Sequence, residues 1–306
     1  MIELLNINTS LSPSFEPFWF NSEEYAGKQA EGEGILLYYK KEEKEIFLRL
    51  YRKDQTLISP LRAPFGSLEF STQTDLQTLY EFVKESLEKI KLSGIRSMQL
   101  VAPPECYDLQ KADMLDEVLI HAGFSVTVTE LNYHLETNLG AFENFIHDSE
   151  KRRLRKSIQA GFECTVAQEI DYKAVHQLIA ECRKRKGYPL SMPAEAFEKM
   201  FRDFPERYTL FTVKDQSKII AAAVGVKVRS DILYNFLPAD DEDYLSYSPI
   251  VLLNKAMYDY CCQNGYHLYD LGIATSGGVR NEGLIRFKEH LGAALSHKYS
   301  YEIKLG

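Results

Sequence analysis

The feature that most constrains this 306-residue chain is a succession of elements that occurs twice. In each half the pattern predicts a helix, a strand, a second helix and a last strand, with a glycine ending each helix. These glycines are Gly94 and Gly123 in the first half, 29 residues apart, and Gly265 and Gly292 in the second half, 27 residues apart. The same order at similar spacing indicates an internal duplication, although few residues are identical between the halves.

In the first copy, residues 74–77 read Thr-Asp-Leu-Gln, which has the form of a capping box and predicts the start of a helix. Apolar residues then keep helical spacing as far as residue 90. The rest of this copy is predicted as a strand over 95–103, a helix over 112–122 and an alternating strand over 124–136. Two further strand-like segments, 45–52 and 56–61, precede it.

In the second copy, Ser248 is predicted as an N-cap with Pro249 at the first helical position. A strand over 266–271, a loop over 272–281, a helix over 282–291 and a strand over 295–305 follow. Strands over 208–215, 219–228 and 232–237 precede this copy, and a basic helix, a strand and another helix come before them. The prediction is an α/β protein of two tandem domains, 1–139 and 140–306, each with a mixed sheet flanked by helices.

Charge is distributed unevenly between the halves. Residues 1–149 hold 13 Lys and Arg against 24 Asp and Glu, a net charge of −11, whereas residues 150–306 hold 23 against 20, a net charge of +3. The second half is therefore the better place for an anionic ligand. We expect a cytoplasmic protein, because the sequence has no secretion signal or membrane-length apolar run, and its five cysteines indicate neither disulfides nor a metal site.

The order of elements resembles the GNAT fold. The basic run 151–156, Lys-Arg-Arg-Leu-Arg-Lys, followed by Ser248-Pro249, a strand ending Asp-Leu-Gly at 270–272 and the Gly-x-x-x-Phe-Lys-x-x-x-Gly pattern at 283–292, more specifically resembles FemAB-type and CelD-like acyltransferases. The acetyl-CoA signature of ordinary GNAT enzymes is absent, and residues 245–249 stand in its place. The resemblance implies two GNAT-like domains, with a degenerate donor site in the first and the active site in the second.

Acyl transfer needs a site for the donor's phosphates, a polarised carbonyl and a deprotonated amine. A helix beginning at Ser248 and Pro249 presents free N–H groups and a dipole that favours anions, so these residues are candidates for donor binding. In the following loop, Gly277 and Gly278 permit close backbone approach, and Arg280 suits a phosphate or carboxylate. A capped core helix and an ordinary glycine-rich turn are the alternatives.

The resemblance places Phe287 and Lys288 against the acyl donor, the lysine acting by its charge and the ring by packing. Helical geometry alone also allows a core phenylalanine and a solvated lysine. Asp270, at a strand end, is a candidate general base, and Tyr247 is an alternative proton carrier. Tyr234 is another proton carrier and a candidate substrate contact.

Four arginines complete the candidate substrate-binding residues. The run at 151–156 supplies three of them, which suit the phosphates of a nucleotide-linked or tRNA substrate, although a solvated helix face is the simplest reading. The fourth precedes a Pro-Phe-Gly segment that occupies the position of the donor loop in the first copy. They are Arg152, Arg153, Arg155 and Arg62.

The prediction for function is an N-acyltransferase that moves an acyl group from an acyl-CoA-type donor to an amine. One alternative is a FemAB-type transferase that uses aminoacyl-tRNA and acts on a peptidoglycan or nucleotide-linked precursor. The other is a non-catalytic ligand-binding or scaffold protein on a degenerate GNAT fold. We expect a small-molecule or precursor substrate, acyl-CoA or aminoacyl-tRNA as co-substrate, and no covalently bound cofactor or metal. A tRNA partner is not favoured, and no DNA or integral-membrane partner is expected.

Overall fold

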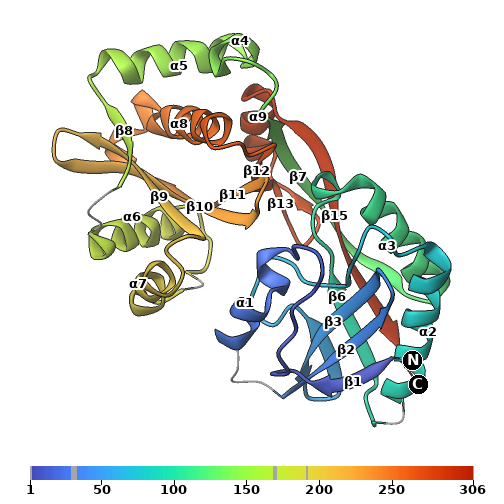
Figure 1. Cartoon of the computed structure of the whole chain (residues 1–306). Helices are drawn as coiled ribbons and strands as arrows, with labels where there is room; N and C mark the ends of the chain where they lie inside the picture. The colour runs from blue at the N-terminus through green and yellow to red at the C-terminus, as the bar shows by residue number, and fades with distance from the viewer. Residues whose placement is uncertain (1, 29–32, 92, 168–170, 191, 306) are drawn as a thin grey trace. The chain divides into compact units, whose positions relative to one another are not determined.

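The computed structural model describes residues 2–28, 33–91, 93–167, 171–190 and 192–305 (Figure 1). The chain divides into two compact units. Unit 1 comprises Met1–Asn132, Thr275–Arg280 and Ser296–Gly306, and unit 2 comprises Tyr133–Ala274 and Asn281–Leu295. In the part of the chain that the structure describes, no helix is long and apolar enough to cross a bilayer.

The sheet of unit 1 contains strands from both ends of the chain. Its order is β1 (Glu3–Asn6), β2 (Gly34–Lys41), β3 (Lys44–Lys53), β4 (Thr56–Ser59), β6 (Ser97–Val101), β15 (Ala294–Lys304) and β7 (Ser125–Glu136), with β5 (Glu69–Phe70) beside β3. The pair β4 and β6 is parallel, with Thr56 opposite Ser97, and α2 (Leu76–Lys91) connects them. The remaining helices of this unit are η1 (Trp19–Asn21), α1 (Glu23–Lys28), η2 (Glu105–Tyr107) and α3 (Leu109–His121).

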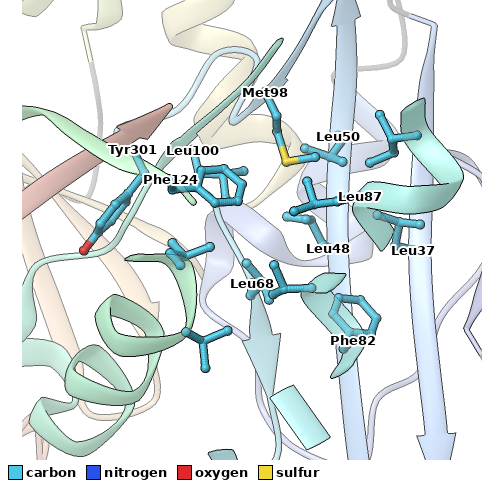
Figure 2. Close-up of a cluster of buried hydrophobic side chains, with 14 of the residues drawn as sticks. Leu37, Leu48, Leu50, Leu68, Phe82, Leu87, Met98, Leu100, Phe124 and Tyr301 are labelled. Atoms are coloured by element: carbon cyan, nitrogen blue, oxygen red, sulfur yellow. The ribbon is translucent and has the colours of Figure 1, made fainter. Parts of the chain in front are cut away.

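The core of unit 1 lies where α2 and α3 pack on this sheet (Figure 2). Alternate residues of β3 point into it, because successive side chains of a strand face opposite sides. On α2, the apolar positions predicted from helical spacing are buried, except for Leu76, which is half-buried. Labelled members of this core are Leu48, Leu50, Phe82, Leu87, Met98, Leu100, Phe124 and Tyr301.

The sheet of unit 2 begins with the end of β7 and continues through β12 (Leu268–Ile273), β11 (Ile232–Asp240), β10 (Lys218–Arg229), β9 (Tyr208–Asp215) and β8 (Glu163–Val166). Figure 1 shows helices on both faces of this sheet. One face carries α5 (Asp148–Gln159) and α8 (Pro249–Gln263), and the other carries α6 (Tyr172–Arg185) and α7 (Ala194–Asp203). The short α4 (Phe142–Phe145), η3 (Glu242–Tyr247) and α9 (Glu282–His290) complete the unit.

The predicted duplication is visible in the connections. The succession α2, β6, α3, β7 in the first half matches α8, β12, α9, β15 in the second, and β12 pairs in parallel with β11 as β6 does with β4. The four glycines that end the helices have φ values of 74°, 96°, 74° and 77°. Only glycine adopts this left-handed backbone at no steric cost, which is why it ends each helix.

One prediction about local structure needs correction, and the predicted domain boundary stays a prediction. The cap of α2 is Asp75, whose Oδ1 accepts a hydrogen bond from the Thr78 N–H at 2.8 Å, and not Thr74, whose hydroxyl is buried beside Ser71. The compact units also differ from the predicted boundary at 139/140, because unit 2 begins at Tyr133. Moreover, β15 pairs with β6, so the last strand of the second copy completes the sheet of unit 1.

Candidate active site

The centre of the candidate site in unit 2 is the buried amine of Lys288 on α9. Only 5% of this residue is exposed. Its Nζ donates hydrogen bonds to the carbonyl oxygens of Gly272 at 2.7 Å and Ile273 at 2.8 Å, at the end of β12. The helix therefore points a lysine inward at the place where the strand ends, and the solvated alternative for this side chain is wrong.

Burial lowers the pKa of Lys288 from its ordinary value of 10.5 to about 7, and the nearby charge of Asp270 offsets only part of that effect. Near neutral pH the amine is therefore present in both forms. The neutral amine has two N–H donors, which the two carbonyl groups use, and a lone pair that remains. The ammonium form has a third N–H that is available to a substrate oxygen.

Asp270 is the negative charge of this cluster. It is 1% exposed, and its Oδ1 accepts a hydrogen bond from the Gly272 N–H at 2.8 Å, which is a turn-stabilising contact. In the parallel ladder Asp270 lies opposite Tyr234. Burial raises the pKa of the Tyr234 phenol, and the Asp270 charge raises it further. The pairing of β11 with β12 thus brings together Asp270 and Tyr234, which were separate candidates in the sequence.

Gly272 makes room for Tyr234. A Cβ atom at this position would lie 3.1 Å from Cε2 of the Tyr234 ring, and the φ of Gly272 is 75°. Any other residue would be strained in this backbone conformation and would push against the ring. The glycine therefore fixes both the turn after β12, which presents its carbonyl to Lys288, and the position of the tyrosine.

Two residues of this cluster were not among the sequence candidates. Tyr133 on β7 places its ring 6.0 Å from the Lys288 Nζ, and its hydroxyl donates to Glu289 at 3.2 Å. His134 has a buried Nδ1 atom with no hydrogen-bond partner in the described chain. Burial lowers the pKa of His134, and the Asp270 charge acts in the opposite direction. Alternation placed both residues on a strand, but no local signal connects that strand with α9.

The start of α8 is built differently from the prediction. Ser248 is the N-cap residue and Pro249 the first helical residue, but Ser248 has a left-handed backbone with φ 56° and its side chain makes no cap hydrogen bond. Instead, α5 holds this turn, since Lys156 Nζ donates to the Ser246 carbonyl and Ser157 Oγ to the Tyr247 carbonyl, each at 2.7 Å. No described contact joins the turn to Lys288.

A buried polar network connects α8 with the strands of the cluster. The Tyr269 hydroxyl donates to Asn254 Oδ1 at 2.9 Å, and Asn235 Nδ2 donates to the Tyr269 hydroxyl at 2.8 Å. Asn254 Nδ2 in turn donates to the Ile250 carbonyl at 2.7 Å in the first turn of the helix. Asn235 and Tyr269 are the chain neighbours of Tyr234 and Asp270, so this network fixes the helix start against the strands that carry the site.

The glycine-rich loop has a local role. Gly277 and Gly278, with φ values of 58° and 78°, form the turn between β13 (Thr275–Ser276) and β14 (Val279–Arg280). Both glycine N–H groups donate to the carboxylate of Glu130, at 2.8 and 3.3 Å. An anion would have to displace Glu130 from these amides. With the exposed Arg280, this loop belongs to unit 1, as does the exposed Arg62.

The basic run forms most of α5. Arg152, Arg153 and Arg155 are all exposed, and Arg153 pairs with the fully buried Glu150, with an N–O distance of 2.8 Å. Tyr247 lies under Lys156, whose Nζ is 4.6 Å from the ring centroid. These residues are therefore on the α5 side of unit 2.

On α9, Phe287 is half-buried, next to the buried Lys288. Of the Phe-Lys pair that the resemblance singled out, the lysine is therefore buried inside unit 2 and the phenylalanine ring is partly accessible.

Comparisons with known proteins identify a GNAT domain and similar folds. Residues 148–289 match the model of the acetyltransferase (GNAT) domain. No curated protein matches the sequence. The structure of FemX aligns with a TM-score of 0.70 at 13% identity and covers 94% of this chain and 92% of that chain.

Two further structures extend the comparison. A tandem GNAT protein from the clavulanic acid biosynthesis pathway aligns with a TM-score of 0.56 at 11% identity over 100% of this chain and 99% of that chain. The C-terminal domain of a protein described as a lysylphosphatidylglycerol synthetase from Agrobacterium fabrum aligns with a TM-score of 0.57 at 12% identity over 85% and 81%. The chain therefore has a FemAB-like GNAT fold with two GNAT-like domains, as predicted.

Proposed function

We propose that this protein, which has a GNAT domain at residues 148–289, is an N-acyltransferase whose reaction centre is the Lys288 cluster of unit 2. The single observation that carries the proposal is a buried lysine with a pKa of about 7 whose amine is fixed by two carbonyl groups at a strand end. Strongly perturbed, positioned ionisable groups are typical of catalytic sites.

In this proposal a neutral acceptor amine attacks the carbonyl carbon of an activated acyl donor and forms the C–N bond. The C–S or C–O bond of the donor breaks, and the proton that the amine loses passes to the leaving sulfur or oxygen. Lys288 in its ammonium form donates its third N–H to the oxygen that becomes negative in the transition state, and the two backbone carbonyls hold it in place. Asp270 keeps enough of the lysine charged at neutral pH, because it opposes the effect of burial on the pKa.

The donor is proposed to be an acyl-CoA. The match of residues 148–289 to the acetyltransferase (GNAT) domain supports this choice. A donor site at Ser248 and Pro249 would use the first turn of α8 and the nearby ammonium group of Lys156, which already contacts this turn. Phe287, half-buried and adjacent to Lys288, would pack against the acyl group.

A second candidate donor is an aminoacyl-tRNA, with a precursor as acceptor. The fold likeness to FemX over nearly the whole chain, and to the protein described as a lysylphosphatidylglycerol synthetase, supports it. So do the exposed Arg152 and Arg155 on α5, which suit phosphates of a nucleic acid. The absence of the usual acetyl-CoA signature at residues 245–249 is consistent with this alternative.

The first test is a transfer assay with both donors and a panel of amines, comparing the wild type with Lys288→Met and Lys288→Arg. We expect Lys288→Met to lower kcat by about 100-fold to 1,000-fold, the usual loss for one oxyanion donor, with a much smaller change in donor binding. Lys288→Arg keeps the charge and is expected to retain part of the activity.

The matched control is Lys184→Met, which removes an exposed lysine from α6 and should leave kcat unchanged. Wild-type activity in a folded Lys288→Met variant would refute the assigned role. A folded wild type that binds neither acetyl-CoA nor charged tRNA by calorimetry would favour the non-catalytic alternative. Turnover with charged tRNA alone would select the second donor.

A further inference from the structure

Unit 1 contains a separate pocket that the proposed reaction does not use. It has a volume of about 90 Å³ and lies at the carboxyl end of β6, between η2, the first turns of α3 and the strand β15. This volume is far below the roughly 300–1,000 Å³ of pockets that hold drug-sized ligands. The pocket therefore suits a small group, or the head of a longer ligand.

The lining of this pocket is strongly acidic. It includes five carboxylates and one lysine, Lys111. A phosphate or carboxylate ligand would have to enter against this excess of negative charge, whereas a cation would be attracted to it. The carboxylates are Glu69, Glu105, Asp108, Asp113 and Asp116.

Aromatic rings form much of the remaining wall. Phe18 packs on Tyr107 with ring centroids 5.4 Å apart, and Tyr299 packs on Tyr301 with centroids 6.1 Å apart. Rings next to carboxylates are the surroundings in which proteins hold organic cations, because the ring face is also electronegative. Burial raises the pKa of Tyr299, and the charge of Glu105 raises it further, so this ring lies within the carboxylate field.

Lys111 is an alkylammonium group that lies next to aromatic rings at the edge of this pocket, of which Phe70 lines the pocket and Phe15 does not. Its Nζ donates to the Phe70 carbonyl at 2.6 Å and lies 5.3 Å from the Phe70 ring and 5.2 Å from the Phe15 ring. The N-terminus of α3, which on its own would favour an anion, is already capped, since Asp108 Oδ1 accepts from the Lys111 N–H at 3.1 Å.

We propose that this acidic and aromatic pocket of unit 1 binds the head group of a small organic cation, a primary alkylammonium. The ammonium lies among the carboxylates, with Glu105 as its principal partner, and the alkyl chain contacts the faces of Tyr299 and Tyr107. Glu105 is the carboxylate chosen for the test because it is half-buried. Its Oε2 accepts from the main-chain N–H of His297 at 2.8 Å, which a glutamine oxygen also accepts, and lies 3.3 Å from the His297 Nδ1, so a bound ammonium would share this carboxylate with the imidazole.

Ligand-observed NMR titration of the full chain tests the ligand class with three probes of similar size. We expect n-butylammonium to bind saturably, and n-butanol and butyrate to bind at least about tenfold more weakly, because only the first carries the complementary charge. Equal binding of n-butanol would show an apolar pocket. Preference for butyrate, or no binding of n-butylammonium, would also overturn the proposal.

The location is tested with Glu105→Gln, compared with Glu117→Gln, which makes the same change of charge at an exposed position of α3 outside the pocket. Glu105→Gln is expected to weaken n-butylammonium binding by about fivefold, and Glu117→Gln to leave it unchanged. Asp116→Asn is a second pocket variant, in case the first folds poorly. Wild-type affinity in both folded pocket variants would refute the site.

The same titration on Lys288→Met separates this inference from the proposed function. We expect n-butylammonium binding to remain as in the wild type, because the two sites lie in different units. Loss of binding in this variant would mean that the titration reports the reaction centre instead, and would overturn the assignment to unit 1.

Discussion

At the level of single residues, the amine of Lys288 has the clearest physical signature in the molecule. A charged lysine loses hydration when it is buried, so folding favours the neutral amine and its pKa falls to about 7. Two carbonyl groups at 2.7 and 2.8 Å compensate part of this loss. The charged form of this side chain is thus costly for the stability of the folded chain.

This cost predicts a pH dependence. Between pH 7 and 10.5 the unfolded chain holds the Lys288 proton more tightly than the folded chain does, so the free energy of unfolding should rise with pH in this range. Denaturant unfolding should show this rise, by roughly 3 to 5 kcal/mol, in the wild type relative to Lys288→Met. Lys184→Met is the control, and equal pH profiles for the wild type and Lys288→Met would contradict the prediction.

Among the secondary-structure elements, α8 depends on the buried network more than on its cap. Ser248 makes no cap hydrogen bond, while Asn254 connects the first turn of the helix to Tyr269 on β12 and Asn235 on β11. One polar atom of this network, Asn235 Oδ1, is buried without a hydrogen-bond partner in the described chain, so each of the remaining hydrogen bonds matters for stability. The position of the helix start relative to β12 is therefore set from inside the unit.

We predict that Asn254→Ala lowers the free energy of unfolding by about 2 to 4 kcal/mol, because the Tyr269 hydroxyl loses its oxygen acceptor and the Ile250 carbonyl loses a side-chain donor. Asn264→Ala is the matched control, since Asn264 is an exposed asparagine that follows the end of the same helix. Chemical denaturation measures both variants. A loss below roughly 0.5 kcal/mol, which is the spread of neutral surface substitutions, would show that the network contributes little.

At the scale of the whole molecule, the last strand, β15, shows that the compact units do not coincide with the two copies of the repeat. β15 pairs with β6 and its Tyr301 is buried in the core of unit 1, although the strand ends the second copy of the repeat (Figure 2). The end of β7, from Tyr133, belongs in turn to unit 2, where it lies next to β12. Each copy thus provides a strand to the sheet of the other unit, so the two units are not independent segments of the chain.

We predict that Tyr301→Ala destabilises unit 1 by about 3 to 5 kcal/mol, since it removes a large buried side chain and a hydrogen bond to Asp116. Amide hydrogen exchange should show loss of protection in β3 and β6, and much less change in β9 and β10. Lys304→Ala, an exposed change on the same strand, should have no effect. Equal or greater loss in β10 would contradict the assignment of β15 to unit 1.

The sequence by itself determined the features that depend on neighbouring residues. Helical spacing, the four glycines with positive φ, the proline at the start of α8 and the alternating strands are local signals, and they sufficed to predict the duplicated α/β fold. The position of Asp270 at a strand end is also a local signal, whereas Lys288 was singled out by the resemblance to FemAB-type enzymes.

Only the tertiary structure decided what depends on pairing between distant segments. It brought Tyr133, His134 and Tyr234 close to Asp270 and Lys288. It also placed β15 in unit 1 and paired the N–H groups of the loop at Gly277 with the Glu130 carboxylate. The alternation of a strand fixes which side chains share a face but does not identify the neighbouring strand. Burial of a charge likewise depends on that neighbour, so the lowered pKa of Lys288 follows from the fold and not from its helix alone.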